Sequence, residues 1–406
     1  MAIVKKITIA AVLLFLVYCS SDSGIDKTYL EAHRRAIPDI DAIKADVPSE
    51  TTAQAGALVG DDALIPPVAI GVATDINTQV AALLSSLKTI TDTPPTFYDS
   101  ETNEYLWGPF NNDDSELKDD TIAVYIRDKG EDIGLQDEDL RYEYALLRGM
   151  SRDLSTMEPV IWGGHTPDPN NEDYGQGAIL YDLQANLAWE DQYNPGHGNL
   201  AEGRFAVAYV KQREATGQSS SENADLTIVV GAFRNFVPGP EDWEDSAQKP
   251  DAIDAEYLWG GVKTDAGESF SFINVNVNGN IFPFEDPSTG STEENFGILA
   301  AFATNGVGRG RLDVYGDDVT AAYGANTFLE GQECWDTLLE RTYFGIESVN
   351  QSDSNDRTDI ASEGNENDCE QSILLSDIPD LDGLEQEGAD LLNALVDLAE
   401  NGVPSS

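Results

Sequence analysis

Hydrophobic and polar residues alternate along two parts of the chain that each lead into an Asn-Gly pair. Residues 269–277 run up to Asn278-Gly279, and residues 296–303 run up to Asn305-Gly306. Asn-Gly accepts the positive φ angles of a type I′ turn, so each pair predicts a β-hairpin. The second strands of the two hairpins are predicted at residues 281–284 and 310–315. Two hairpins so close together indicate an antiparallel sheet.

Shorter stretches of the same kind predict further strands upstream. The predicted strands lie at residues 96–98, 104–107, 121–127, 141–148, 157–162, 177–183, 203–210 and 226–233. Residues 141–148 also fit a helix. Short strands at regular spacing with polar turns are typical of sheets, sandwiches and barrels. The predicted fold is therefore mainly β with flanking helices: a large antiparallel sheet, a sandwich or an incomplete barrel.

Two segments have the period of an amphipathic helix. The first begins at Thr74 as N-cap and ends before Pro94-Pro95, with one apolar face at Ile76, Val80, Leu83, Leu84, Leu87 and Ile90. The second has leucines at helical spacing from Leu381 to Leu398 and stops at Gly402. Both apolar faces are expected to pack on the sheet. Residues 29–44 fit one or two short helices, and residues 53–67 read as a linker.

The charge of the chain limits its partners. It has 74 acidic and 23 basic residues, a formal net charge of −51. Nucleic acid and anionic membrane surfaces would be repelled, so neither is an expected partner. Such a charge suits a saline exterior, where salt screens the repulsion.

The N-terminus has the composition of an export signal. Lys5-Lys6 precede an apolar run at residues 7–18, which is too short to span a bilayer, and Cys19 follows it. This arrangement resembles the lipobox of bacterial lipoproteins, with Leu16 at position −3, although Tyr18 departs from its small residue at −1. The resemblance implies a lipid on Cys19, which becomes the mature N-terminus. Ser20 next to it favours the outer membrane.

Four short motifs in the body of the chain point to the same class of protein. They are Ile76-Asn77, residues 91–96, Trp107-Gly108-Pro109 and Glu333-Cys334-Trp335-Asp336. Their combination resembles an uncharacterised group of exported bacterial lipoproteins. The resemblance implies location and architecture and assigns no active site.

Once Cys19 carries a lipid, Cys334 and Cys369 are the two remaining cysteines. An oxidising compartment favours a disulfide between them, with two free thiols as the alternative. The bond would close a polar, acidic loop at residues 346–377. In the chain-entropy picture it would stabilise the fold by about 3–4 kcal/mol.

These elements give a plan of five parts. They are an export signal at residues 1–18, a lipid anchor and linker with short helices at residues 19–71, a helix with an antiparallel β-domain at residues 72–345, the disulfide-closed loop at residues 346–377 and a C-terminal helix at residues 378–406.

One loop has the oxygen-rich composition that calcium prefers. Asp168, Asn170, Glu172 and Asp173 are the predicted ligands. The loop departs from the EF-hand, because Asp173 stands where the EF-hand requires glycine. The alternative is a chance acidic cluster on an acidic surface, and calcium is the only cofactor considered.

The chemistry of the chain suggests a non-enzymatic role. It lacks the common hydrolase and nucleotide-binding motifs, and we expect it not to be an enzyme. The first hypothesis is a cell-envelope lipoprotein with a binding or structural role toward a protein partner. The second is a carrier whose first long helix leaves a cavity for an apolar, lipid-like ligand. The third is an exported hydrolase, which would require His165 and His197, both predicted in turns, to meet carboxylates in one cleft.

Overall fold

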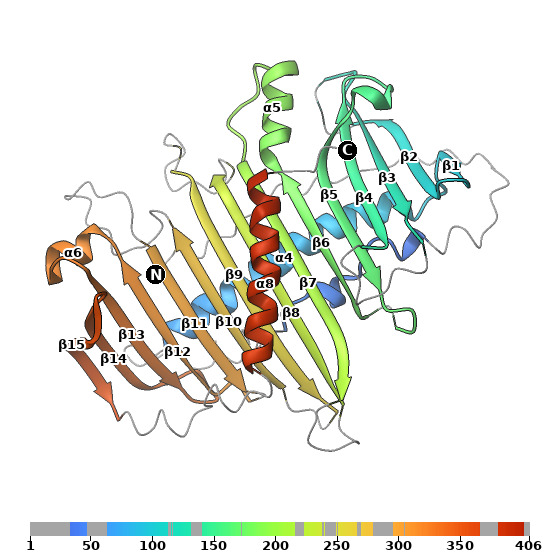
Figure 1. Cartoon of the computed structure of the whole chain (residues 1–406). Helices are drawn as coiled ribbons and strands as arrows, with labels where there is room; N and C mark the ends of the chain where they lie inside the picture. Colours follow the sequence, from blue (N-terminus) through green and yellow to red (C-terminus); the bar gives the residue numbers. More distant parts are fainter. Residues whose placement is uncertain are drawn as a thin grey trace.

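The described part of the chain is organised by a single β-sheet. The structure, a computed structural model, describes residues 33–46, 63–112, 115, 117–130, 140–171, 173–215, 223–237, 239, 249, 251–265, 269–278, 295–303, 305–365 and 381–401. Fifteen strands form one antiparallel sheet in which each strand pairs with its neighbours in sequence, from β1 at one end to β15 at the other (Figure 1). The sheet does not close into a barrel. The prediction of a mainly β fold with one large antiparallel sheet is confirmed.

The order of the strands across the sheet is the same as their order in the chain. They are β1 (Phe97–Asp99), β2 (Glu104–Asn111), β3 (Thr121–Asp128), β4 (Tyr142–Gly149), β5 (Glu158–Pro167), β6 (Gly175–Asp182), β7 (Glu202–Ala215), β8 (Asn223–Val237), β9 (Ile253–Thr264), β10 (Ser269–Asn278), β11 (Asn295–Ala303), β12 (Gly308–Tyr315), β13 (Thr327–Trp335), β14 (Arg341–Asn350) and β15 (Asp353–Gly364). The predicted strands from residue 96 to residue 233 are confirmed, and residues 141–148 belong to a strand.

Helices cover both faces of the sheet. They are α2 (Ile40–Ile43), α4 (Ile65–Thr91), α5 (Leu183–Tyr193), α6 (Asp317–Tyr323) and α8 (Leu381–Asn401), with a 3₁₀ turn, η2, at Leu154–Thr156. Helix α4 crosses one face, called here the α4 face, and α8 lies on the opposite α8 face over β7, β8 and β9 (Figure 1). The two predicted helices are confirmed as elements that pack on the sheet.

The α4 face holds the larger core. Val80, Leu84 and Leu87 of α4 are buried there with aromatic residues of the central strands. Three tyrosines lie directly opposite glycines on the neighbouring strand, and their rings occupy the space that a glycine side chain would fill. The pairs are Tyr144 with Gly163, Tyr209 with Gly177, and Tyr257 with Gly231. Because these rings cover the glycine backbone, the sheet is well packed beneath the helix.

Both ends of α4 are held by distant strands. At its N-terminus the Glu333 carboxylate on β13 accepts hydrogen bonds from the backbone N–H of Leu64 (2.7 Å) and Ile65 (2.8 Å). Just beyond its C-terminus the Trp107 indole on β2 donates to the carbonyl of Thr93 (2.7 Å). The helix has 27 residues and spans about 40 Å. From β2 to β13 the sheet extends about 50 Å at the usual strand spacing, so it must curve around the helix.

The four short motifs noted in the sequence lie at or near these attachments. Trp107 and Glu333 hold the two ends of α4, and the N–H of Gly108 donates to the Thr96 hydroxyl (2.9 Å). Asn77 on α4 exchanges two hydrogen bonds of 2.9 Å with the backbone of Ala45 beside α2. The residues that carry the resemblance therefore position α4 on the sheet.

The start of α4 corrects the sequence analysis. The helix begins at Ile65, not at Thr74, so the predicted linker at residues 53–67 overlaps its first turn. Pro66 and Pro67 suggested a linker, but proline is tolerated in a first helical turn, where its missing N–H would have no partner within the helix.

The first predicted hairpin is also wrong. Strand β10, which ends at Asn278, pairs with β9 and β11 on its two sides, so residues 281–284 are not its partner. Residues 279–294 lie outside the described residues. The second hairpin is confirmed, since β11 pairs with β12. Its turn is not type I′, because Gly306 has a positive φ of 84° and Asn305 does not.

The predicted acidic loop at residues 346–377 is wrong for its first half. Residues 346–350 belong to β14, and residues 353–364 form β15. Every residue of β15 is exposed, so no apolar alternation marks the strand in the sequence. Pairing of its backbone with β14 forms the strand instead.

Candidate functional site

The predicted calcium loop connects β5 to β6 at the surface. Asp168 accepts hydrogen bonds from the backbone N–H of Asn170 (2.7 Å) and Asn171 (3.2 Å), which makes it the first residue of a local turn. Asp173 donates its N–H to the Asn171 side chain (3.2 Å). Glu172 lies outside the described residues. Within the described ranges no three His, Cys, Asp or Glu side chains are grouped to hold a metal. Calcium binding at Asp168, Asn170, Glu172 and Asp173 stays a prediction.

The cysteine predictions rest partly on residues that the structure leaves out. Cys334 is fully buried on β13, on the opposite face from Glu333 and Trp335. Cys369 and Cys19 lie outside the described residues, as does the whole predicted export signal. The Cys334–Cys369 disulfide and the lipid on Cys19 stay predictions.

His165 was predicted to lie in a turn, but it lies in the core. It belongs to β5 on the α4 face and is 2% exposed. Its Nδ1 atom lies 2.5 Å from the Tyr209 hydroxyl and 3.2 Å from the carbonyl oxygen of Gln176. Burial lowers the pKa of His165 to about 3, so the ring is neutral at physiological pH. This histidine fixes the position of a core tyrosine.

His197 lies at the surface and forms a different pair. Its Nε2 atom is 2.9 Å from Asp191 Oδ1, and its Nδ1 atom is 2.6 Å from the carbonyl oxygen of Gly198. The hydrogen bond to Asp191 raises the pKa of His197, because both ring nitrogens face oxygen acceptors that favour the protonated ring. A shallow hollow of about 400 Å³ lies here, lined by His197, Asp191 and Glu202 but not by His165. The two histidines predicted for a hydrolase are therefore not brought together.

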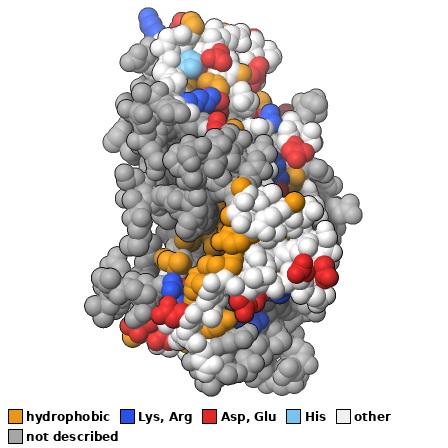
Figure 2. Space-filling model, turned by 90° about the vertical axis from the view of Figure 1, so that its left-hand side faces the viewer, with side chains coloured by type: hydrophobic (Ala, Val, Ile, Leu, Met, Phe, Trp, Pro, Cys, Tyr) orange, Lys and Arg blue, Asp and Glu red, His pale blue; other side chains and the backbone are white. Residues whose placement is uncertain are grey.

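The carrier hypothesis required a cavity beneath α4. The two best-formed hollows in the described part of the protein, of about 400 and 630 Å³, are open and mostly polar, and α4 lines neither. Figure 2 shows a band of hydrophobic side chains on one side of the molecule. Binding of an apolar ligand stays a prediction.

Helix α4 is also apolar enough in length and composition to cross a membrane. Its 18-residue window of mean hydropathy 1.3 is 44% buried within the protein. Ile70, Val80 and Leu84 pack on the sheet, so here α4 is a core helix.

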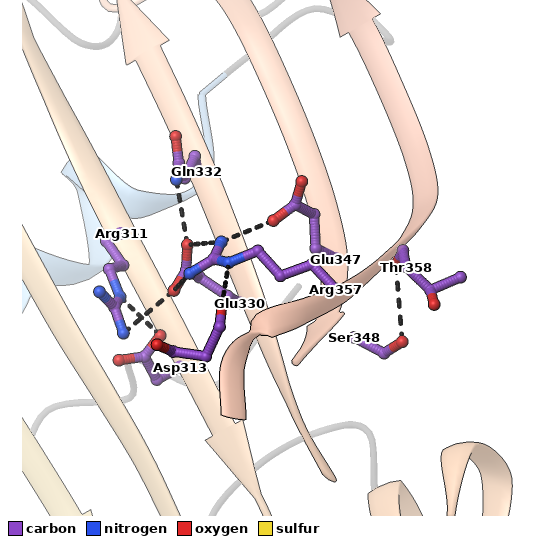
Figure 3. Close-up of polar contacts among 9 residues, drawn as sticks. Arg311, Asp313, Glu330, Gln332, Glu347, Ser348, Arg357 and Thr358 are labelled. Atoms are coloured by element: carbon purple, nitrogen blue, oxygen red, sulfur yellow. Dashed lines mark hydrogen bonds and ion pairs between the residues drawn. The ribbon is translucent and has the colours of Figure 1, made fainter. Parts of the chain in front are cut away.

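A network of charges at the β15 end of the sheet escaped the sequence analysis. Glu330 on β13 is 2% exposed and lies between two arginines (Figure 3). Arg357 of β15 donates to both of its carboxylate oxygens (2.9 and 3.1 Å), and Arg311 of β12 lies 3.1 Å from Oε2. Arg357 also donates to Glu347 of β14 (2.6 Å), and Arg311 donates to Asp313 (2.8 Å). These bonds tie four consecutive strands together.

The arginines set the protonation state of this network. Burial acts to raise the pKa of Glu330, but the hydrogen bonds from Arg357 and Gln332 and the positive charges of Arg311 and Arg357 together hold that pKa below its usual value. Burial raises the pKa of Asp313, despite the opposing effect of Arg311. No local pattern could have revealed the network, because its members come from four strands. Within residues 353–363 only the presence of Arg357 among four acidic residues hinted that one member of the network has charged partners elsewhere.

Beyond this network, β15 is an exposed edge. It pairs with β14 on one side, and no strand of the described part pairs with its other side. At the opposite end of the sheet the edge strand β1 has only three residues. A long edge strand presents unpaired backbone donors and acceptors to solvent. Among the described features, this edge is the surface best suited to another protein chain.

Comparison of the chain with protein-family models, with curated proteins and with solved structures finds no match.

Proposed function

We propose that the chain is a non-enzymatic protein of the cell envelope, anchored to the outer membrane by a lipid on Cys19, with a binding or structural role. The observation that carries the binding role is the β15 edge. A strand of twelve exposed residues ends a curved sheet whose faces are covered by α4 and α8. The backbone of this edge is the accessible hydrogen-bonding surface of the sheet.

Two of the titratable groups buried in the sheet, His165 and Arg148, support a structural role for the core. His165 pairs with Tyr209 beneath α4. Arg148 on β4 pairs with Asp120 (2.7 Å) and Glu190 (2.5 Å) and stacks 3.6 Å from the centre of the Trp189 ring. Each group is engaged by partners that hold neighbouring elements together, as expected for residues that stabilise a scaffold.

Membrane fractionation of the full chain tests the anchor. Wild-type protein should be in the outer-membrane fraction, and its N-terminal peptide should carry the mass of a lipid. Cys19→Ala should release the protein from that fraction or leave an uncleaved precursor. Ser20→Ala, which keeps the cysteine, is the matched control and should remain attached. Unchanged fractionation and mass in Cys19→Ala would refute the lipoprotein assignment.

A further inference from the structure

We propose that β15 binds an extended, basic segment of a partner protein, which adds to the sheet as its next strand. The proposal deepens the binding role above and rests on it. Strand addition to an exposed edge is a general mode of peptide recognition: backbone hydrogen bonds provide affinity, and side chains provide specificity.

The edge is held ready for such pairing. Strand β15 pairs with β14 from Gly364 opposite Tyr343 to Asp353 opposite Asn350, with register shifts at Ile346/Glu347 and at Val349/Asn350. Arg357, in the first half of the strand, is fixed by Glu330 and Glu347 (Figure 3). A partner therefore meets a strand that is already extended, which lowers the entropy cost of binding.

The charge of β15 selects the partner. The strand carries four carboxylates, at Asp353, Asp356, Asp359 and Glu363, and one basic residue, Arg357. The positive charge of Arg357 is directed to Glu330 and Glu347, so it does not offset the carboxylates along the edge. Opposite charges on adjacent strands stabilise pairing, whereas like charges oppose it. An incoming strand rich in lysine or arginine therefore complements the charge of this edge.

A second copy of the chain is a poor occupant. Two β15 strands side by side would bring their carboxylates together, and the net charge of −51 adds long-range repulsion between copies. The short β1 offers only three residues to pair with β15 of another molecule. The acidic edge thus disfavours self-association and leaves a basic strand as the complementary partner.

The test uses the full chain and a peptide of about twelve residues that alternates lysine and threonine. Fluorescence anisotropy should show binding, and hydrogen exchange should show protection of the amides at residues 353–364. Charge reversal by Asp356→Lys with Asp359→Lys should weaken binding at least about tenfold and create affinity for the matching glutamate–threonine peptide. The control Asp119→Lys with Glu158→Lys changes net charge equally at exposed sites away from β15, and should bind like the wild type.

Four results would overturn the proposal. One is that the peptide does not bind, and another is that both double variants lose affinity equally, which would mean attraction to the acidic protein as a whole. The third is protection located outside residues 353–364. A glycine–lysine peptide of equal charge but low strand propensity should bind weakly, and equal affinity for it would also argue against pairing. None of these results depends on Cys19, so failure here is distinct from failure of the lipid anchor.

Discussion

Replacing Glu333 should release the N-terminus of α4 from the sheet. The Glu333 side chain is 1% exposed and makes three hydrogen bonds: two from the backbone N–H groups of Leu64 and Ile65, and one from Arg341 Nε at 2.8 Å. In Glu333→Gln the side chain loses its charge. Its amide NH₂ group must then point either at the backbone N–H groups of Leu64 and Ile65 or at Arg341, and both are hydrogen-bond donors. The variant therefore removes the buried negative charge that faces both the Arg341 guanidinium and the N-terminus of α4.

The structure sets the size of this effect. A carboxylate at a partly buried helix N-terminus contributes up to about 2 kcal/mol, and breaking a buried ion pair costs about 3–5 kcal/mol. Because glutamine keeps one acceptor, we expect the free energy of unfolding to fall by about 3 kcal/mol. Urea unfolding followed by tryptophan fluorescence measures the loss, and hydrogen exchange should show faster opening of the first turn of α4.

Glu330→Gln is the matched control. Glu330 lies three residues away on the same strand, is equally buried and pairs with arginines, but has no contact with the start of α4. It should loosen β15 and leave the exchange of α4 unchanged. Adding Arg341→Met to Glu333→Gln should recover part of the stability, because the cation that has lost its buried counter-charge is removed. A loss below about 1 kcal/mol in Glu333→Gln, or unaltered exchange at α4, would contradict the proposed attachment.

Three further predictions concern protons, cysteines and ions. His165 is neutral when folded, with a pKa of about 3 against 6.5 when exposed, so the free energy of unfolding should fall as the pH drops from about 6.5 toward 3. His165→Asn should flatten that part of the profile, and an unchanged slope would count against burial as the cause. Non-reducing peptide mapping should find Cys334 linked to Cys369, whereas two alkylatable thiols in native protein would exclude the bond. Sodium chloride should raise the melting temperature gradually, and a saturable calcium increment lost in Asp168→Asn would show a specific loop.

The sequence predicted strands well where one face is apolar and the other polar. Residues 269–277 show this in two halves: Phe270 and Phe272 pack on the α8 face with serine between them, and Ile273, Val275 and Val277 are buried on the α4 face with asparagine between them. The same approach failed at β13, where Glu330 and Glu333 occupy buried positions. Each is compensated by an arginine from another strand, which a local pattern cannot reveal. The charged residues at buried positions therefore prevented β13 from being predicted by its pattern of apolar residues.

The candidate site was less accessible to sequence reasoning than the fold. His165 looked like a turn residue because Gly163, Gly164 and Pro167 surround it, yet Gly163 is there to admit the ring of Tyr144. The exposed edge at β15 depends on which strand is last in the sheet. That is a property of topology, which side-chain periodicity does not encode.

The strictly sequential order of the strands has a consequence for folding. A sheet in which each strand pairs with the strand before it can grow one strand at a time as the chain becomes available, because each step brings together segments that are neighbours in the sequence. Helix α4 is expected to complete its docking later than its position in the sequence suggests. Its sequence precedes all fifteen strands, but the Glu333 that receives its first turn lies 268 residues beyond Ile65. The first long helix in the sequence is therefore among the last elements to dock fully. Its N-terminus can bind Glu333 only after the sheet has formed as far as β13.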